Sequence, residues 1–153
     1  MAVKPIPDGY HSVTPYLIIK NSASKAIDYY KKAFGATELM RMPGPDGTIG
    51  HAEIKIGDSP IMLADEMESM GFKSPQSYGG TPVSLMIYVK DVDKIFKQAI
   101  SAGGKEIQPL ENKFYGDRSG TLSDPFGHCW TVGTHVEDVA PDEMDRRMKE
   151  MMK

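Results

Sequence analysis

The chain has 153 residues, of which 40% are hydrophobic and 25% are charged, and its formal net charge is −3. This balance is ordinary for a globular protein and gives no sign of nucleic-acid binding. No apolar run approaches the roughly 18 residues that a membrane span needs, and no signal-peptide pattern is visible. The single cysteine, Cys129, excludes an intramolecular disulfide and fits a reducing compartment. We therefore expect a cytoplasmic domain that has neither nucleic acid nor membrane as a partner.

The first structural unit is predicted over about residues 10–65. Residues 13–20 are rich in strand-forming side chains and predict a strand. Apolar residues at helical spacing follow, with Asn21 or Ser22 as the expected N-cap and Gly35 as the left-handed stop. Three more strands are expected at residues 37–42, 48–56 and 61–65. The order of this unit is therefore βαβββ.

The second unit repeats this order over residues 81–136, after a linker at 66–80 that is rich in Glu, Ser, Gly and Pro. Its helix is expected at about 92–102, with Asp91 as the cap. Its strands are expected at residues 83–89, 105–109, 114–122 and 128–134. The two halves also align directly, since Lys20 falls on Lys90 and Glu38 on Glu106. A tandem repeat of this kind can curl its sheets around a cavity.

The last part of the chain, residues 137–153, predicts one further helix over 141–152. Pro141 suits a first helical turn, and the acidic pair after it complements the helix dipole. Five of the eleven methionines lie at the chain ends or in this helix, namely Met1, Met144, Met148, Met151 and Met152. Methionine fills irregular apolar gaps, so we expect this helix to pack on its own subunit or on a partner.

The turn before the last strand contains Asp124, Pro125 and Gly127. These residue types are explained by turn chemistry, in which the aspartate bonds the backbone. Trp130 should face away from Thr131 because side chains alternate along a strand. We therefore expect Trp130 in the core.

The βαβββ repeat and residues 115–130, which read YGDRSGTLSDPFGHCW, resemble the vicinal-oxygen-chelate superfamily, the group of glyoxalase I, bleomycin-resistance proteins and extradiol dioxygenases. Residues 26–30, 33–36 and 51–53 are similar to its PhnB-like branch. The resemblance covers about residues 10–136. It implies an α+β fold of two tandem βαβββ modules that form an open, cup-like barrel with helices outside. It also implies a homodimer.

Metal-using members of that superfamily place a His, Gln or Glu ligand on the first and the last strand of each module. In this chain those positions fall near Thr14 and Ser84 on the first strands, and near Ala64 (or Met62) and Thr131 on the last. None of these side chains is a usual ligand for a divalent ion. We therefore expect no metal cofactor, with a divalent metal at a displaced site as the alternative.

His51 and Glu53 are the candidate catalytic residues. They alternate with Ala52 and Ile54 along a strand, so both side chains lie on one face. Such a pair can bind a metal or exchange protons. The alternative is an ordinary solvated strand face that Lys55 continues.

The candidate ligand-binding residues come from two places in the repeat. By alternation, Tyr16 of the first module lines the cup, as do Ser84, Met86 and Tyr88 of the second. Tyr115 and Arg118 lie in a tight loop at the expected rim. Tyr115 can stack on a planar ligand, and Arg118 can hold a carboxylate or phosphate or else pair with Asp117 or Asp124.

These observations leave three functions open. The first is a small-molecule-binding protein of the glyoxalase/bleomycin-resistance type without the usual metal site. The second is a divalent-metal-dependent lyase, isomerase or dioxygenase that uses His51, Glu53 and His128. The third is a ligand-free structural or regulatory dimer held by the methionine-rich helix.

Overall fold

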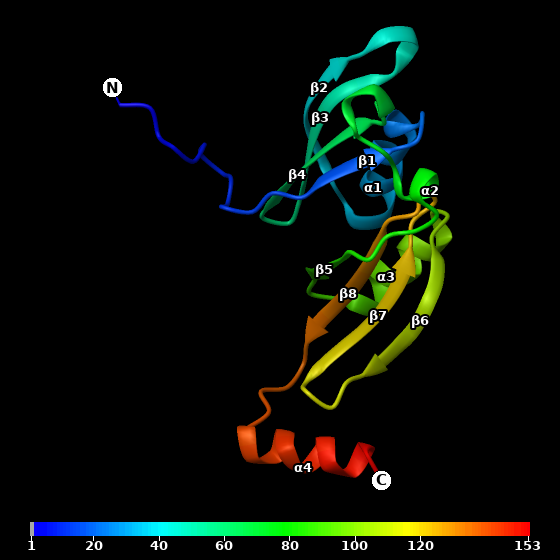
Figure 1. Cartoon of the computed structure of the whole chain (residues 1–153). Helices are drawn as coiled ribbons and strands as arrows, with labels where there is room; N and C mark the ends of the chain where they lie inside the picture. The colour runs from blue at the N-terminus through cyan, green and yellow to red at the C-terminus, as the bar shows by residue number, and fades with distance from the viewer. Residues whose placement is uncertain (1) are drawn as a thin grey trace.

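The computed structural model describes residues 2–153 and contains two modules with the same order of elements (Figure 1). The first module consists of β1 (Tyr16–Ile19), α1 (Ala23–Phe34), β2 (Thr37–Pro43), the short 3-10 helix η1 (Pro45–Gly47), β3 (Ile49–Ile56) and β4 (Ser59–Asp65). The connection contains the 3-10 helix η2 (Glu68–Met70) and α2 (Pro75–Tyr78). The second module and the C-terminal helix consist of β5 (Ser84–Tyr88), α3 (Val92–Ser101), β6 (Lys105–Asn112), β7 (Asp117–Ser123), β8 (Cys129–His135) and α4 (Pro141–Met151).

Each module folds into one four-stranded mixed sheet. The strand orders are β1-β4-β3-β2 and β5-β8-β7-β6, and the first and last strand of each module pair in parallel. Within residues 2–153 no strand pairing joins the two sheets, so they do not close into a barrel. The predicted α+β fold of two tandem βαβββ modules with a C-terminal helix is confirmed. No helix of the described residues is long and apolar enough to cross a membrane.

Helices α1 and α3 pack against each other and join the modules on one side of the sheets (Figure 1). The hydroxyl of Tyr29 donates to the carbonyl of Ala99 at 3.1 Å, and the side-chain amide of Gln98 donates to the carbonyl of Ala33 at 3.1 Å. Helix α1 packs on one face of the first sheet and α3 on one face of the second. The opposite face of each sheet, over which neither α1 nor α3 lies, is called uncovered below.

The core connects the modules through aromatic rings and one buried carboxylate. Trp130 is fully buried, as expected, and its ring lies 5.3 Å from that of Tyr30 in the other module. The carboxylate of Asp124 accepts from the Tyr30 hydroxyl at 2.6 Å and from the Trp130 indole at 2.9 Å. It also accepts from the amides of Phe126 and His128, which confirms its predicted role in the turn. Burial and the Asp124 charge hold the pKa of Tyr30 well above its ordinary value.

The N-terminus of α1 is capped by a residue distant in sequence. Neither Asn21 nor Ser22 caps it: the Ser22 hydroxyl donates to the carbonyl of Lys20 instead. The carboxylate of Asp65, at the end of β4, accepts from the amide of Ala23 at 2.9 Å and from the amide of Ile49 at 2.8 Å. The expected local cap is therefore wrong. The parallel pairing of β1 with β4 brings the Asp65 carboxylate to the free amide of Ala23 at the start of α1.

The 66–80 segment is a folded connection. The carboxylate of Glu66 accepts from the amide of Ser74 at 2.9 Å and from the hydroxyl of Ser77 at 2.8 Å. A β-bridge pairs Met67 with Phe72. These contacts fold the segment back beside β1 and β4, which its composition did not predict.

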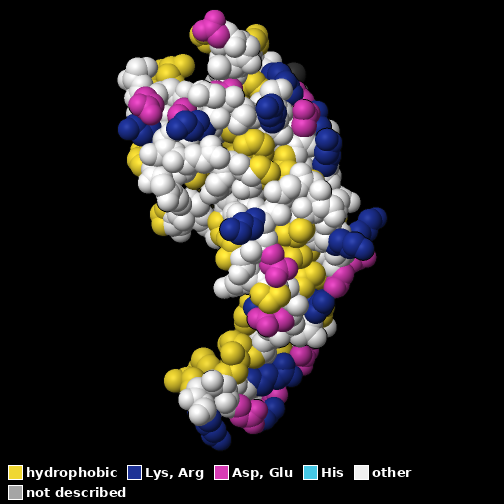
Figure 2. Space-filling model, turned by 90° about the vertical axis from the view of Figure 1, so that its right-hand side faces the viewer, with side chains coloured by type: hydrophobic (Ala, Val, Ile, Leu, Met, Phe, Trp, Pro, Cys, Tyr) yellow, Lys and Arg dark blue, Asp and Glu magenta, His cyan; other side chains and the backbone are white. Residues whose placement is uncertain are grey.

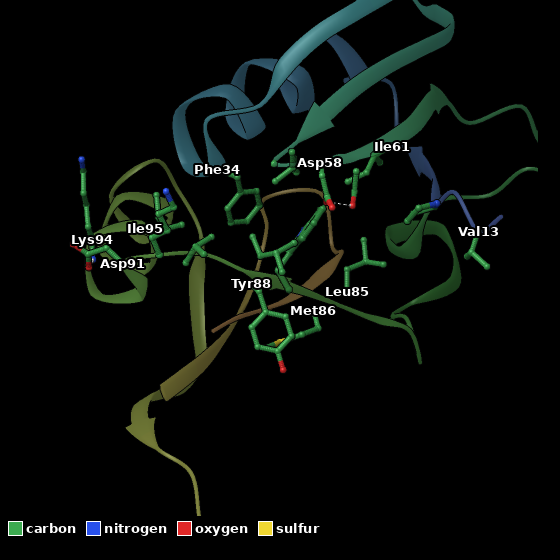
Figure 3. Close-up of a pocket in the computed structure, with 18 residues that line it drawn as sticks. Val13, Phe34, Asp58, Ile61, Leu85, Met86, Tyr88, Asp91, Lys94 and Ile95 are labelled. Atoms are coloured by element: carbon green, nitrogen blue, oxygen red, sulfur yellow. Dashed lines mark hydrogen bonds between the residues drawn. The ribbon is translucent and has the colours of Figure 1, made fainter. Parts of the chain in front are cut away.

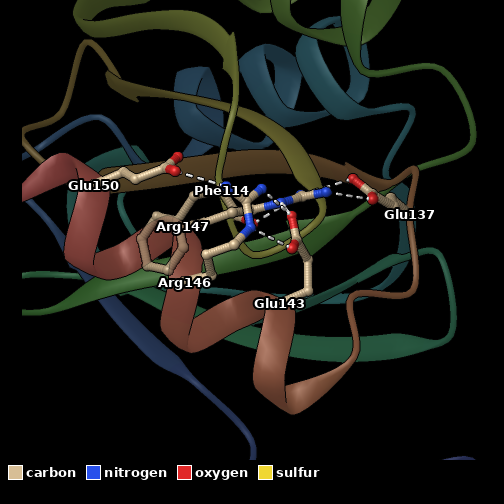
Figure 4. Close-up of polar contacts among 6 residues, drawn as sticks. All are labelled: Phe114, Glu137, Glu143, Arg146, Arg147 and Glu150. Carbon is tan, nitrogen blue, oxygen red and sulfur yellow. Dashed lines mark hydrogen bonds and ion pairs between the residues drawn. The ribbon is translucent and has the colours of Figure 1, made fainter.

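Helix α4 lies at the end of the molecule and is fastened mainly by Arg147 (Figure 4). The Arg147 guanidinium donates to the carbonyl of Phe114 at 3.1 Å and pairs with Glu137 and Glu143 at 2.7 Å. Hydrophobic side chains gather at this lower end, where the outline of the molecule is hollowed (Figure 2). Met148 and Met151 of α4 are 43% and 70% exposed, so much of the apolar side of α4 is not covered by residues 2–153.

Candidate functional site

The uncovered face of the first sheet carries polar side chains in a row. Alternation along β3 turns Ala52 and Ile54 toward α1, where both are fully buried. His51 and Glu53 point to the opposite face and are only partly exposed. The register pairs Met62 with both Tyr16 and Glu53, so residues of β1, β4 and β3 meet on this face. The predicted placement of His51 and Glu53 on one face is what the structure has.

Four side chains form a continuous hydrogen-bonded chain, here called the first-sheet row. The hydroxyl of Tyr16 lies 2.8 Å from Nδ1 of His51, and Nε2 of His51 lies 3.0 Å from Oε1 of Glu53. The hydroxyl of Tyr10, in the segment before β1, donates to Oε2 of Glu53. Both nitrogens of His51 and both oxygens of Glu53 therefore have partners, which fixes the orientation of the row.

A cavity of about 220 Å³, here called the first-sheet cavity, lies beside this row. Tyr16 belongs to both, since it is one of the residues that line the cavity and its hydroxyl bonds His51. The folded connection supplies one wall. Apart from Gly50 and Asp65, the other lining side chains are apolar: Ile18, Ala64, Met67, Met70 and Phe72. Both carboxylate oxygens of Asp65 are already bonded to backbone amides. The arrangement combines an apolar pocket with a few convergent polar groups, as small-molecule sites do.

The uncovered face of the second sheet carries a second polar row. The carboxylate of Asp117, which is buried, accepts from the hydroxyl of Tyr88 at 2.7 Å and bonds Nδ1 of His135 at 2.8 Å. Nε2 of His135 bonds Asp138 at 2.9 Å. The hydrogen bonds to Asp138 and Asp117 raise the pKa of His135, and the bond to Asp117 raises that of Tyr88. With a carboxylate on each nitrogen, His135 ties the segment before α4 to the sheet.

The positions that correspond to the superfamily's metal ligands carry no set of donors that suits a divalent ion. Ser84 and Thr131 lie 3.4 Å apart through their hydroxyls, and Thr131 bonds Thr121 at 3.0 Å. Ala64 has no donor atom and lines the first-sheet cavity. Neutral hydroxyls and methyl groups are poor partners for such a metal. Among residues 2–153 no three His, Cys, Asp or Glu side chains come together in a way that could hold a metal ion.

Arg118 lies on the helix side of the second sheet. Its guanidinium pairs with Asp93 of α3 at 2.7 Å and also contacts Asn112 at 3.3 Å, so neither Asp117 nor Asp124 is its partner. Arg118 was expected in a rim loop, where it would hold a ligand or pair with Asp117 or Asp124; it lies instead in β7 and pairs with Asp93. The reason is that Arg118 alternates with Asp117, whose side chain points to the uncovered face.

The remaining predicted residues lie apart from the first-sheet row. Tyr115 is in the β6–β7 loop, with its ring edge-on to Phe114 at 5.3 Å. Met86 and Tyr88 line a larger groove between the modules, which has a volume of about 920 Å³ (Figure 3). Its apolar walls include Phe34 and Leu85. The groove follows the unpaired edge of β5, and Tyr88 connects it to the polar row of the second sheet through Asp117.

Sequence reasoning missed Tyr10, Asp117 and His135 as members of polar rows. Tyr10 precedes the first strand and carries no periodic signal, and its contact with Glu53 spans 43 residues. His135 had one detectable signal, because alternation places it on the same face as Thr131. His128 belongs to neither row, since its Nε2 bonds the carbonyl of Ile18 at 3.0 Å.

Comparisons with known proteins agree with the topology. The model of the glyoxalase/bleomycin resistance protein/dioxygenase superfamily matches residues 12–132. The uncharacterized protein Rv0887c of Mycobacterium tuberculosis is 45% identical over 140 residues, covering 90% of this chain and 82% of that protein. The crystal structure of TioX from Micromonospora sp. ML1 is 27% identical with a TM-score of 0.63, covering 85% of this chain and all of TioX. A Bacillus cereus PhnB protein, a putative 3-demethylubiquinone-9 3-methyltransferase by its description, shares the fold at 19% identity and a TM-score of 0.65, covering 81% of this chain and 99% of its own.

Proposed function

Since the chain belongs to the glyoxalase/bleomycin resistance protein/dioxygenase superfamily, we propose that it binds a small organic molecule on the uncovered face of its first sheet. In this proposal, binding does not use the superfamily's usual metal ligands. The absence of a suitable donor set at Thr14, Ala64, Ser84 and Thr131 supports that part. The lone cysteine supports a cytoplasmic setting.

The observation that carries the proposal is the position of Tyr16 between an apolar cavity and a polar row. Tyr16 is one of the residues that line the first-sheet cavity, and its hydroxyl bonds His51. A ligand with an apolar body and one polar group would meet both kinds of surface at once. The cavity volume of about 220 Å³ is below the range of roughly 300–1,000 Å³ typical of drug-sized ligands. The ligand is therefore smaller than a typical drug.

A fragment screen by ligand-detected NMR tests the proposal. Wild-type protein is compared with an Ala64→Leu variant, in which the larger side chain fills the first-sheet cavity. The matched control is Thr131→Leu, which adds bulk at the corresponding strand of the second sheet. Fragments that bind the wild type and the control but not Ala64→Leu are the expected result. Fragments that bind Ala64→Leu as tightly as the wild type would show that the binding site is not the first-sheet cavity.

Added volume can strain a strand, so a second variant avoids this risk. Met70 is 66% exposed and forms part of the cavity wall, so Met70→Ala should weaken the same fragments while the fold is retained.

The second candidate function is a divalent-metal lyase, isomerase or dioxygenase at a displaced site. The distance of 3.0 Å between His51 and Glu53 is the observation that favours it. Near-stoichiometric metal after desalting, lost in His51→Ala, would support this function over metal-free binding. His128 would not join that pair without giving up its bond to the Ile18 carbonyl.

Two copies of the chain are also proposed to associate through α4. The exposed methionines of α4 are the supporting observation, because contiguous apolar surface commonly marks an interface. A regulatory dimer that binds no ligand would rest on the same surface.

A further inference from the structure

We infer that the ligand is a neutral molecule that donates a hydrogen bond to the hydroxyl oxygen of Tyr16 and places an aromatic ring, or a group of that size, in the first-sheet cavity. This inference rests on the proposed function and adds the chemical class of the ligand. It is carried by the direction of the hydrogen bonds in the first-sheet row and by the lining of the cavity.

The donor and acceptor of each bond in the first-sheet row can be assigned by beginning with Glu53. We assign the bonds by taking Glu53 as the acceptor, to which Tyr10 and Nε2 of His51 donate. With the proton of a neutral imidazole on Nε2, Nδ1 of His51 accepts from the Tyr16 hydroxyl. The one proton of Tyr16 is thereby engaged. Its oxygen keeps a lone pair, and that lone pair accepts a bond from a ligand.

The same arrangement keeps Tyr16 a neutral phenol. Burial raises the pKa of its hydroxyl above the ordinary value. The hydroxyl therefore stays protonated and bonded to His51, and the surface offered to the ligand is an uncharged acceptor. A ligand that can only accept a hydrogen bond finds no free proton there.

The residues that line the cavity determine which chemical groups the rest of the ligand can carry. Its walls are formed by the side chains of Ile18, Ala64, Met67, Met70 and Phe72. A charged group would lose its hydration on these walls without compensation. Thioether sulfurs make favourable contacts with aromatic rings, and a volume of about 220 Å³ admits a single substituted ring. A phenol combines a ring with a neutral hydroxyl donor.

The test compares two probes, 4-methylphenol and 4-methylanisole, in which the hydroxyl donor of the first is replaced by a methoxy group in the second. At about pH 8 imidazoles are ordinarily neutral and 4-methylphenol, with the pKa of a tyrosine side chain, is uncharged. Affinities are measured from the shifts of 13C-labelled methionine methyls. The wild type should bind the phenol about tenfold more tightly, which is the scale of one net hydrogen bond. Equal affinities for the two probes would overturn the inference.

Two variants separate the role of Tyr16 from a structural effect. Tyr16→Phe should reduce the tenfold ratio to about one, while the matched Tyr88→Phe in the second-sheet row should leave it unchanged. His51→Ala frees the Tyr16 proton to donate, so binding of 4-methylanisole should improve relative to the phenol. A ratio that persists in Tyr16→Phe overturns the inference.

Failure of the inference is distinguishable from failure of the proposed function. Equal binding of both probes, with shifts at Met67 and Met70, overturns the donor preference and leaves small-molecule binding in place. If neither probe shifts these methyls, the inference fails, and the proposed function is then decided by the fragment screen with Ala64→Leu.

Discussion

At the scale of single residues, Asp124 makes the contacts that join the two modules. Its carboxylate accepts from a hydroxyl of the first module, an indole of the second and two backbone amides. Sequence reasoning identified the backbone bonds from turn chemistry. The bonds to Tyr30 and Trp130 were not predictable, because no local pattern relates a helix residue to a carboxylate 94 positions later.

We expect Asp124→Asn to lower the free energy of unfolding by about 2–4 kcal/mol, because the amide nitrogen places a donor against buried donors. Chemical denaturation checks this value. Asp93→Asn is the control, since Asp93 is an exposed partner of Arg118, and its variant should change stability little. If the two variants are equally stable, Asp124 does not hold the modules together.

His135 should make stability depend on pH. Its hydrogen bonds to Asp138 and Asp117 raise its pKa in the folded chain, so the folded state favours the protonated ring. The resulting stability is present below the ordinary imidazole pKa of about 6.5 and is lost as pH rises through the raised folded value. Melting temperatures from about pH 6 to pH 9 should fall more for the wild type than for His135→Gln. Parallel curves would contradict this role, and high salt should reduce the difference.

At the scale of elements, alternation and helical spacing predicted the eight strands, the helices α1, α3 and α4, and the shared face of His51 and Glu53, but not the short helices η1, η2 and α2. Each depends on neighbours within a few positions. The cap of α1 was not predictable, because Asp65 reaches the amide of Ala23 only after β1 and β4 pair. The first-sheet cavity was not predictable either, because the bonds of Glu66 to Ser74 and Ser77 fold its wall into place.

The cap of α1 gives a direct comparison of the local and the distant residue. Asp65→Ala should cost about 2–3 kcal/mol, since it removes the acceptor for two backbone amides, whereas Ser22→Ala should cost less than about 0.5 kcal/mol. Unfolding in urea measures both. A larger loss for Ser22→Ala would mean that the local residue caps the helix after all.

At the scale of the whole molecule, α4 extends from the second module with exposed methionines. Removing residues 141–153 should convert an assembly of two copies into single chains, because the apolar face of α4 is then absent. Sedimentation velocity of the two forms gives the masses. Arg147→Ala is the second variant, as it unfastens α4 without shortening the chain. If both variants keep the same number of chains per particle as the wild type, α4 is not part of the interface.

Three hollows in residues 2–153 offer places for a ligand: the first-sheet cavity, the groove beside β5, and a third of about 690 Å³ that Tyr16 and Ile18 also line. The groove beside β5 is larger, and Tyr88 connects it to Asp117, whereas Tyr16 connects the first-sheet cavity to His51. Methionines report on both, since Met67 and Met70 line the cavity and Met86 lines the groove.

The most direct measurement is a 13C-methionine methyl spectrum of the full chain, recorded during titration with a fragment selected by the screen. We predict that the methyl signals of Met67 and Met70 shift to saturation while the signal of Met86 keeps its position. Saturating shifts at Met86 alone would contradict it and would place the ligand in the groove between the modules.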